Sequence, residues 1–142
     1  LAIIDWLDSQ FPVPRLIPTD PLERARVLAQ AQIIISDTQP VQNLRVLKHL
    51  RRQFGADDAA INQWVQHWIG EGLAALEVQA PDEGFFGGPT PNLVDVVLVP
   101  QCVNARRYGL DLAPFPRLVR IEQAMLALDA VAQARPEAIR PS

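Results

Sequence analysis

The chain has 142 residues, which is enough for one domain with a substantial core. Its composition is 49% hydrophobic and 20% charged, a balance that is typical of a globular protein and excludes a disordered one. A formal net charge of -3 gives no basis for expecting nucleic acid or an anionic membrane as a partner.

A short helix is predicted at the start of the chain. Leu1, Ile4 and Leu7 have helical apolar spacing, but no capping residue precedes them. We therefore expect that residues upstream are missing from this sequence. The segment from Ser9 to Thr19 then contains three prolines, so we expect an extended, stiff linker at a domain boundary.

A long helical pattern follows, from Asp20 to about Phe54. Asp20 suits the cap and Pro21 suits the first helical position. Pro40 lies inside the pattern, so a kink or break is expected near Thr38. The apolar face of the second half consists of Leu44, Leu47, Leu50 and Phe54.

The next helix is predicted to begin at Asp57 and Asp58, where negative charge suits a helix N-terminus. Gly72 interrupts its apolar stripe and indicates close contact with another helix, because a missing side chain lets two backbones approach. A loop rich in glycine and proline follows, from Pro81 to Pro91.

Asn92 and Asp95 form a candidate capping box for the third major helix. The next residues, Val96 to Val99, are apolar on every side and by pattern alone could be a buried strand. The capping box favours a central buried helix, with Asp95 buried near its start and a bend at Pro100.

A turn from Asp111 to Pro116 precedes a fourth helix, and a short tail follows Pro136. No sustained alternation typical of strands appears, so we predict an all-α bundle of about five helices. The fourth helix is marked by Leu118, Ile121, Met125 and Leu128.

Catalytic and metal-ligating groups are scarce. His49 and His67 lie on different helices without ligand partners at a standard spacing, so no metal site is predicted. No serine lies in a nucleophile signature. The single cysteine, Cys102, excludes an internal disulfide and suits a reducing cytoplasm, and no long uncharged apolar run indicates a membrane span.

Two polar groups are candidates for a binding site. The residues around Pro40 could hydrogen-bond a polar ligand, or could satisfy the carbonyls that Pro40 leaves without a donor. Arg106 and Arg107 could clamp a carboxylate with two parallel hydrogen bonds, or could interact with the dipole at a helix C-terminus. The sequence leaves both alternatives open for each group. The first group consists of Gln39, Gln42, Asn43 and Arg45.

Five segments carry a family resemblance, in order along the chain: residues 1–7, the linker with Leu16-Ile17-Pro18, residues 39–47, residues 91–95, and residues 99–108 continued by 111–116. Together they resemble the C-terminal, all-helical domain of glutathione S-transferases, and within that family the zeta class, the maleylacetoacetate isomerases. The resemblance covers essentially the whole chain. The class-specific stretches are QPVQNLRVL and VPQCVNARRY.

The resemblance implies a glutathione S-transferase C-terminal-like helical bundle, preceded by the last helix of a missing thioredoxin-like domain. Residues 1–9 would be that last helix of a truncated N-terminal domain, residues 10–19 a linker and residues 20–142 the helical domain. A homodimer is implied as well.

The implied activity is the glutathione-dependent cis–trans isomerisation of maleylacetoacetate to fumarylacetoacetate in the breakdown of tyrosine and other aromatic compounds. The thiolate of glutathione adds to the double bond, the adduct rotates, and the thiolate leaves again. A maleylpyruvate isomerase or a general glutathione transferase is an alternative. A non-catalytic module for binding or assembly is another.

The resemblance also assigns roles to residues. Gln39, Asn43, Leu44 and Arg45 match positions that help hold glutathione, and Arg107 matches the arginine that orients the carboxylates of a small dicarboxylate substrate. The catalytic serine-rich motif and most of the glutathione site belong to the N-terminal domain. No catalytic residue is therefore expected in this chain, which we expect to be inactive alone.

Overall fold

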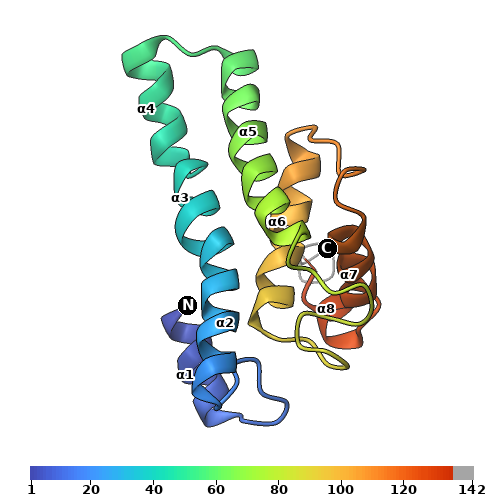
Figure 1. Cartoon of the computed structure of the whole chain (residues 1–142). Helices are drawn as coiled ribbons and strands as arrows, with labels where there is room; N and C mark the ends of the chain where they lie inside the picture. The colour runs from blue at the N-terminus through green and yellow to red at the C-terminus, as the bar shows by residue number, and fades with distance from the viewer. Residues whose placement is uncertain (136–142) are drawn as a thin grey trace.

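A computed structural model of the chain describes residues 1–135 (Figure 1). No strand occurs among these residues, so the predicted all-α class is confirmed. The predicted tail after Pro136 lies outside the described residues. The elements are α1 (Ala2–Gln10), α2 (Pro21–Gln32), the π-helix η1 (Ile33–Thr38), α3 (Gln39–Val41), α4 (Leu44–Phe54), α5 (Asp58–Glu77), α6 (Leu93–Arg107), α7 (Pro116–Leu126) and α8 (Asp129–Gln133).

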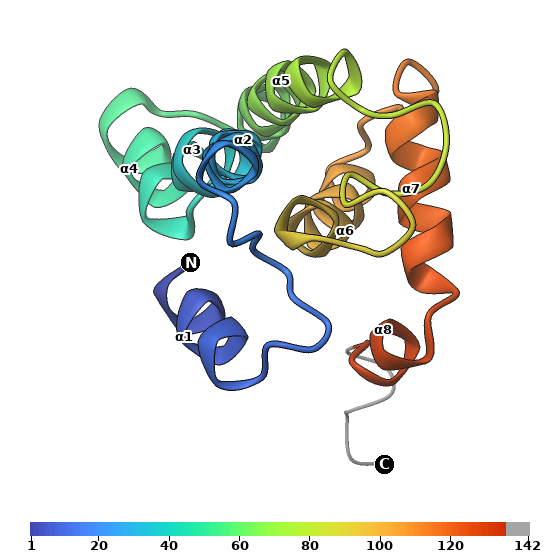
Figure 2. The same cartoon turned by 60° about the horizontal axis from the view of Figure 1, so that its bottom comes forward.

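Helix α6 lies at the centre of the bundle, between α2, α5 and α7 (Figure 2). The rod formed by α2, η1, α3 and α4 runs beside α5 and leads into the loop that joins α4 to α5 (Figure 1). Because α6 is covered from several sides, its first half can be apolar nearly all round. The run from Val96 to Val99 is therefore a buried helix, as its capping box predicted, and not a strand.

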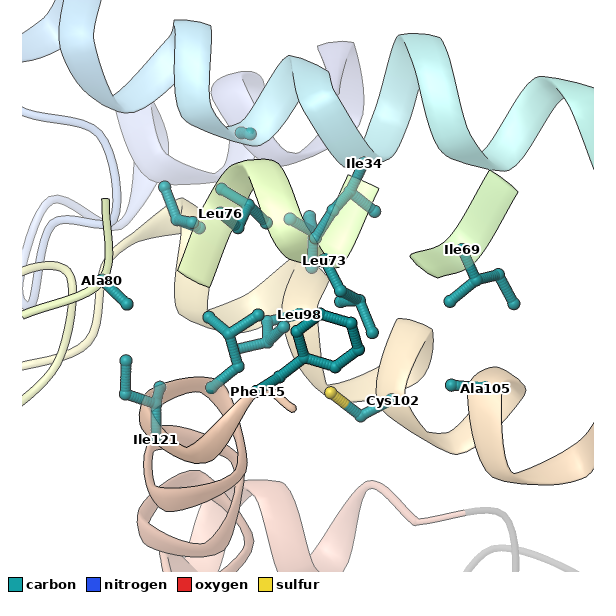
Figure 3. Close-up of a cluster of buried hydrophobic side chains, with 14 of the residues drawn as sticks. Ile34, Ile69, Leu73, Leu76, Ala80, Leu98, Cys102, Ala105, Phe115 and Ile121 are labelled. Carbon is teal, nitrogen blue, oxygen red and sulfur yellow. The ribbon is translucent and has the colours of Figure 1, made fainter. Parts of the chain in front are cut away.

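The core lies where η1, α5, α6 and α7 meet. Its side chains converge from all four elements and from the turn before α7 (Figure 3). Cys102 is buried among them, like the other members of the cluster. Members that are labelled in the close-up include Ile34, Ile69, Leu73, Leu98, Phe115 and Ile121.

The start of α6 is a capping box. The Asn92 side chain accepts a hydrogen bond from Val94 N at 2.8 Å, and the Asp95 carboxylate accepts one from Asn92 N at 2.8 Å. The same carboxylate accepts a hydrogen bond from Phe86 N at 2.9 Å, which ties the preceding loop to the helix. Asp95 is 0% exposed, and burial raises its pKa although the backbone N–H groups that it accepts from oppose the rise.

The rod between Asp20 and Phe54 is not one kinked helix. Its backbone widens before Pro40, so that Gln39 N–H donates to Ile34 O, five residues back. The wide turn accommodates a proline that has no N–H of its own. The chain then leaves the helix at Gln42 and starts α4 at Asn43, whose side chain accepts a hydrogen bond from Arg45 N. A distortion thus ends at Thr38, near which a kink or break was expected, and the helix itself breaks a few residues later, at Gln42.

The predicted close contact at Gly72 is confirmed. A Cβ atom at this position would lie 2.1 Å from Thr38 Oγ1, which is far inside van der Waals contact. Only glycine therefore lets α5 pack this closely against η1. The contact holds the π-helical turn, and hence the start of α3, against the bundle.

Two expectations about apolar residues are corrected. On α4, Leu47 is buried, but Leu44 is 63% exposed and Phe54 is 74% exposed, so the described chain leaves most of that apolar face uncovered. Helix α7 ends at Leu126, and Leu128 has an extended backbone between α7 and α8. Apolar spacing alone could not reveal this end, because Leu128 continues the periodic pattern into the next helix.

Helix α1 makes few contacts with the rest of the described chain. Asp8 is its one buried residue and accepts a hydrogen bond from Leu16 N in the following segment. Asp5 forms an ion pair with Arg24 of α2 at 2.8 Å. None of the helices in residues 1–135 combines the length and apolar character that crossing a bilayer requires.

We predict that Asp95→Ala lowers the free energy of unfolding by roughly 1–3 kcal/mol, because buried backbone donors lose their acceptor. Urea unfolding followed by circular dichroism measures this change. Asp57→Ala is the control, since Asp57 is the exposed N-cap residue of α5, whose side chain accepts a hydrogen bond from Ala60 N. A loss no larger than the control's would contradict the view that burial makes this cap important.

Candidate functional site

Members of the two polar groups meet in one pocket, which lies between α6 and the break that separates α3 from α4 in the rod. The pocket has a volume of about 320 Å³. Gln39 and Gln42 line it from the rod, and Arg107 lines it from the end of α6. Its other lining residues are Pro100, Gln101, Val103 and Asn104.

Gln42 is the centre of a hydrogen-bond network behind this pocket. Its Nε2 donates to Thr38 O at 3.3 Å and to Gln101 Oε1 at 3.1 Å. Its Oε1 accepts a hydrogen bond from Asn104 Nδ2. The network links the break in the rod to α6, so the two walls of the pocket are held together by side chains that are distant in sequence.

A backbone carbonyl at the break near Pro40 also accepts a hydrogen bond from α5. Trp64 Nε1 donates to Val41 O at 2.8 Å, and its ring packs edge-on against Trp68 at a centroid distance of 5.7 Å. These tryptophans are therefore packing residues, and Trp64 also ties α5 to the break in the rod. Gln42 and Trp64 together satisfy two carbonyls at the break. Gln42 also lines the pocket, and its alternative role toward a polar ligand stays a prediction.

The adjacent arginines have different environments. Arg106 forms a bidentate ion pair with Glu122 of α7. Glu122 is fully buried. Arg107 is exposed and, within residues 1–135, has no ion-pair partner. Arg107 is thus the arginine of the pair that can meet an anion in the pocket, whereas Arg106 joins α6 to α7.

A second pocket, of about 570 Å³, lies where α6 meets α7. It is larger, but both of its arginines are engaged: Arg106 with Glu122, and Arg120 with the carbonyls of Pro81 and Gly84. The smaller pocket is the better candidate for an anionic ligand, because its arginine lacks such partners in the described chain.

Three of the residues expected to hold glutathione do not line the pocket. Asn43 caps α4, and Leu44 and Arg45 are exposed on the first turn of that helix. They follow directly after Gln42, so they lie at the edge of the site and not in its wall. Gln39 is the member of that set that lines the pocket.

Gln101 and Asn104 were missed as site residues by sequence reasoning. With Arg107 they are spaced three residues apart on α6, which places all three near one face of the helix. Polar residues at this spacing in a helix that is otherwise buried are a signal that could have found them. Their partner Gln42 could not be inferred, because it lies 59 and 62 residues away.

The described chain offers no nucleophile at this site. Burial raises the pKa of Cys102 to about 12, and the nearby Glu122 carboxylate adds to the rise. The thiol is therefore protonated at neutral pH and is not a nucleophile. Within residues 1–135, no group of three or more histidine, cysteine, aspartate or glutamate side chains could hold a metal ion.

Known proteins share this fold along nearly the whole chain. The family model for the C-terminal domain of glutathione S-transferase matches residues 58–124. A maleylpyruvate isomerase from a Ralstonia species is 45% identical over 141 residues, which cover 96% of this chain and 66% of that protein. A maleylacetoacetate isomerase from Pseudomonas aeruginosa is 42% identical over 135 residues, which cover 95% of this chain and 63% of that protein.

Solved structures of isomerases with the same names also superimpose on this chain. A maleylpyruvate isomerase described as a bacterial glutathione S-transferase of the zeta class superimposes with a TM-score of 0.93 at 44% identity, covering 99% of this chain and 68% of that one. The maleylacetoacetate isomerase of Anaeromyxobacter dehalogenans superimposes with a TM-score of 0.90 at 43% identity, covering 99% and 63%. That structure holds dicarboxyethyl glutathione and citrate in its active site.

The fold and these matches define a helical domain of the glutathione S-transferase type. Within that class, the chain belongs to the zeta class of the glutathione S-transferase family. The resemblance read from residues 39–47 and 99–108 is confirmed. The chain spans 66% and 63% of the length of the two relatives described above.

We predict that Cys102 reacts with iodoacetamide, near pH 8, at least about a hundredfold more slowly in the folded protein than in urea, because the buried thiol stays protonated. Mass spectrometry of the peptide that contains Cys102 measures the rate. Free glutathione in the same solutions corrects for any effect of urea on the reagent. Equal rates in both states would contradict the inert, buried thiol.

Proposed function

We propose that this chain is the helical domain of a glutathione-dependent maleylacetoacetate isomerase. The whole enzyme would convert maleylacetoacetate to fumarylacetoacetate in the breakdown of tyrosine and other aromatic compounds. The observation that carries the proposal is the pocket that joins Gln39 and Gln42 to Arg107, in a chain whose relatives include isomerases of this kind. In one such relative, the active site holds dicarboxyethyl glutathione together with citrate.

The residues of the pocket fit a small acid. A guanidinium binds a carboxylate with two parallel hydrogen bonds, and the exposed Arg107 can supply them. Held in this way, the substrate cannot rotate as a whole while its double bond changes geometry. The amide of Gln39 adds an uncharged hydrogen-bonding group on the opposite wall, whereas the amide of Gln42 is engaged with Thr38, Gln101 and Asn104.

Glutathione, when bound, supplies the thiolate nucleophile of the reaction. The described chain fits that requirement, because its own cysteine is buried and protonated. We assign Gln39, Asn43, Leu44 and Arg45 to contacts with glutathione. The last three lie at the first turn of α4, where a helix N-terminus favours an anionic group such as a peptide carboxylate.

The proposal assigns residues 1–9 to the end of a thioredoxin-like domain, residues 10–19 to a linker and residues 20–142 to the helical domain. In support, α1 exposes the large apolar side chains of Ile3 and Trp6 and buries only Asp8 in the described chain. Catalysis would need the whole protein, and this chain alone would be inactive. We also propose that the enzyme is a cytoplasmic homodimer, which the uncovered apolar side chains of Leu44 and Phe54 would suit.

Maleylpyruvate isomerisation is a second candidate. A relative with that activity in its name is 45% identical to this chain. Both substrates are acids with a cis double bond, so Arg107 could orient either. A general glutathione transferase would act on other electrophiles, and a non-catalytic binding module would act on none.

Turnover of maleylacetoacetate by the full-length protein tests the proposal. We expect isomerisation that requires glutathione, because no thiolate in the described chain can replace it. Maleylpyruvate, assayed in parallel, distinguishes the two isomerases by their kcat/KM values. A full-length protein with no turnover of either acid would instead favour the general transferase or the binding module.

We predict that Arg107→Ala in the full-length enzyme raises KM for the acid at least about tenfold, because a charge-assisted hydrogen bond contributes roughly 1.5–3 kcal/mol. The KM of Arg107→Lys should lie between those of the wild type and Arg107→Ala, since lysine keeps the positive charge but cannot donate two parallel hydrogen bonds. Arg26→Ala is the control, because Arg26 is an exposed arginine paired with Glu23 outside the pocket. Unaltered kinetics in Arg107→Ala would exclude the carboxylate clamp.

A further inference from the structure

One hydrogen-bond donor at the pocket has no partner. Gln101 lines the pocket and is 1% exposed, and its Nε2 makes no hydrogen bond within the described residues. A buried amide N–H2 without an acceptor destabilises a protein, and native structures rarely keep one without a reason. The lining of a binding pocket is a place where such a group can find its acceptor on a ligand.

The orientation of the Gln101 amide follows from its neighbours. Thr38 O can only accept, so Gln42 must turn its Nε2 toward it. The same nitrogen also reaches Gln101, which must therefore present its oxygen to Gln42. Turning the Gln101 amide over would place two N–H2 groups face to face. The network thus leaves Gln101 Nε2 as the unpaired group.

We propose that Gln101 is a binding residue of this pocket, and that its Nε2 donates to an oxygen of the bound acid while Arg107 pairs with a carboxylate of the same molecule. The inference rests on the proposed function and adds a second anchor to it. Arg107 is six positions after Gln101, which corresponds to about 9 Å along the axis of α6. The flexible arginine side chain can shorten this span, so one small dicarboxylate can meet both donors.

The role of Gln42 in this arrangement is to position Gln101. By occupying Gln101 Oε1 it fixes the amide, and its own oxygen is held by Asn104. The binding donor is thereby preorganised, which lowers the entropy cost of binding. The ligand assigned to this donor is the acid that Arg107 binds, and the comparison of malonate with glutathione below tests that assignment.

The test is the binding of malonate, a small dicarboxylate, to the full-length protein by calorimetry near pH 8. In Gln101→Glu the side chain keeps its shape and an oxygen for Gln42, but the free N–H2 becomes an oxygen that repels a carboxylate. We expect the Kd for malonate to rise at least about tenfold, since a charge-assisted hydrogen bond is lost. The Kd for glutathione should change less than about twofold, because Gln101 Nε2 is assigned no hydrogen bond to glutathione.

Two further variants control the result. Gln123→Glu makes the same change of charge on an exposed site of α7 away from the pocket, and should leave the malonate Kd within about twofold because surface charges are screened. Gln101→Met removes the donor without adding charge, and its malonate Kd should rise as well. It keeps the test valid if a glutamate at this buried position prevents folding.

The outcomes separate this inference from the proposed function. If both Gln101 variants bind malonate like the wild type while Arg107→Ala does not, the inference about Gln101 is wrong and the proposed function stands. If malonate and glutathione weaken equally, Gln101 has only a structural role and the inference is again wrong. A wild-type protein that neither binds malonate nor isomerises either acid would overturn both.

Discussion

The burial of α6 is the constraint on which the other features depend. A helix covered by its neighbours must satisfy the polar groups at its ends within the protein. At the N-terminus, Asn92 and Asp95 do so, and Asp95 also holds the preceding loop. Near the C-terminus, Arg106 joins the helix to the buried Glu122 of α7. With both ends fixed, the one polar face of α6 has a defined position opposite the rod.

The break around Pro40 completes the site. Proline removes a donor from the rod, and the wide turn before it accommodates that loss. Where the helix then ends, the carbonyls of Thr38 and Val41 accept hydrogen bonds from the amide of Gln42 and the indole N–H of Trp64. Gln42 is also hydrogen-bonded to Gln101 and Asn104, so the break in the rod is joined to α6. Gly72 makes the arrangement possible, because any side chain there would displace Thr38. The residues at this break, Gln39 and Gln42, thus form one wall of the pocket.

The pocket contains binding groups but no reactive one. Its amides and its arginine donate hydrogen bonds, whereas the thiol of Cys102 lies in the core with a pKa raised to about 12. Such a surface can hold and orient an anionic ligand, and it cannot attack one. This division of tasks agrees with the proposed function, in which bound glutathione supplies the nucleophile and the helical domain holds the acid.

Local chemistry made much of this protein predictable. Capping residues and periodicity are short-range signals, and from them the all-α class, the helix starts at Asp20, Asp57 and Asn92, and the family resemblance followed. The break in the rod at Gln42, the ion pair of Arg106 and the network around Gln101 could not be predicted in this way. These depend on partners 16 to 62 residues apart in sequence, and only the packing of the helices brings such residues together.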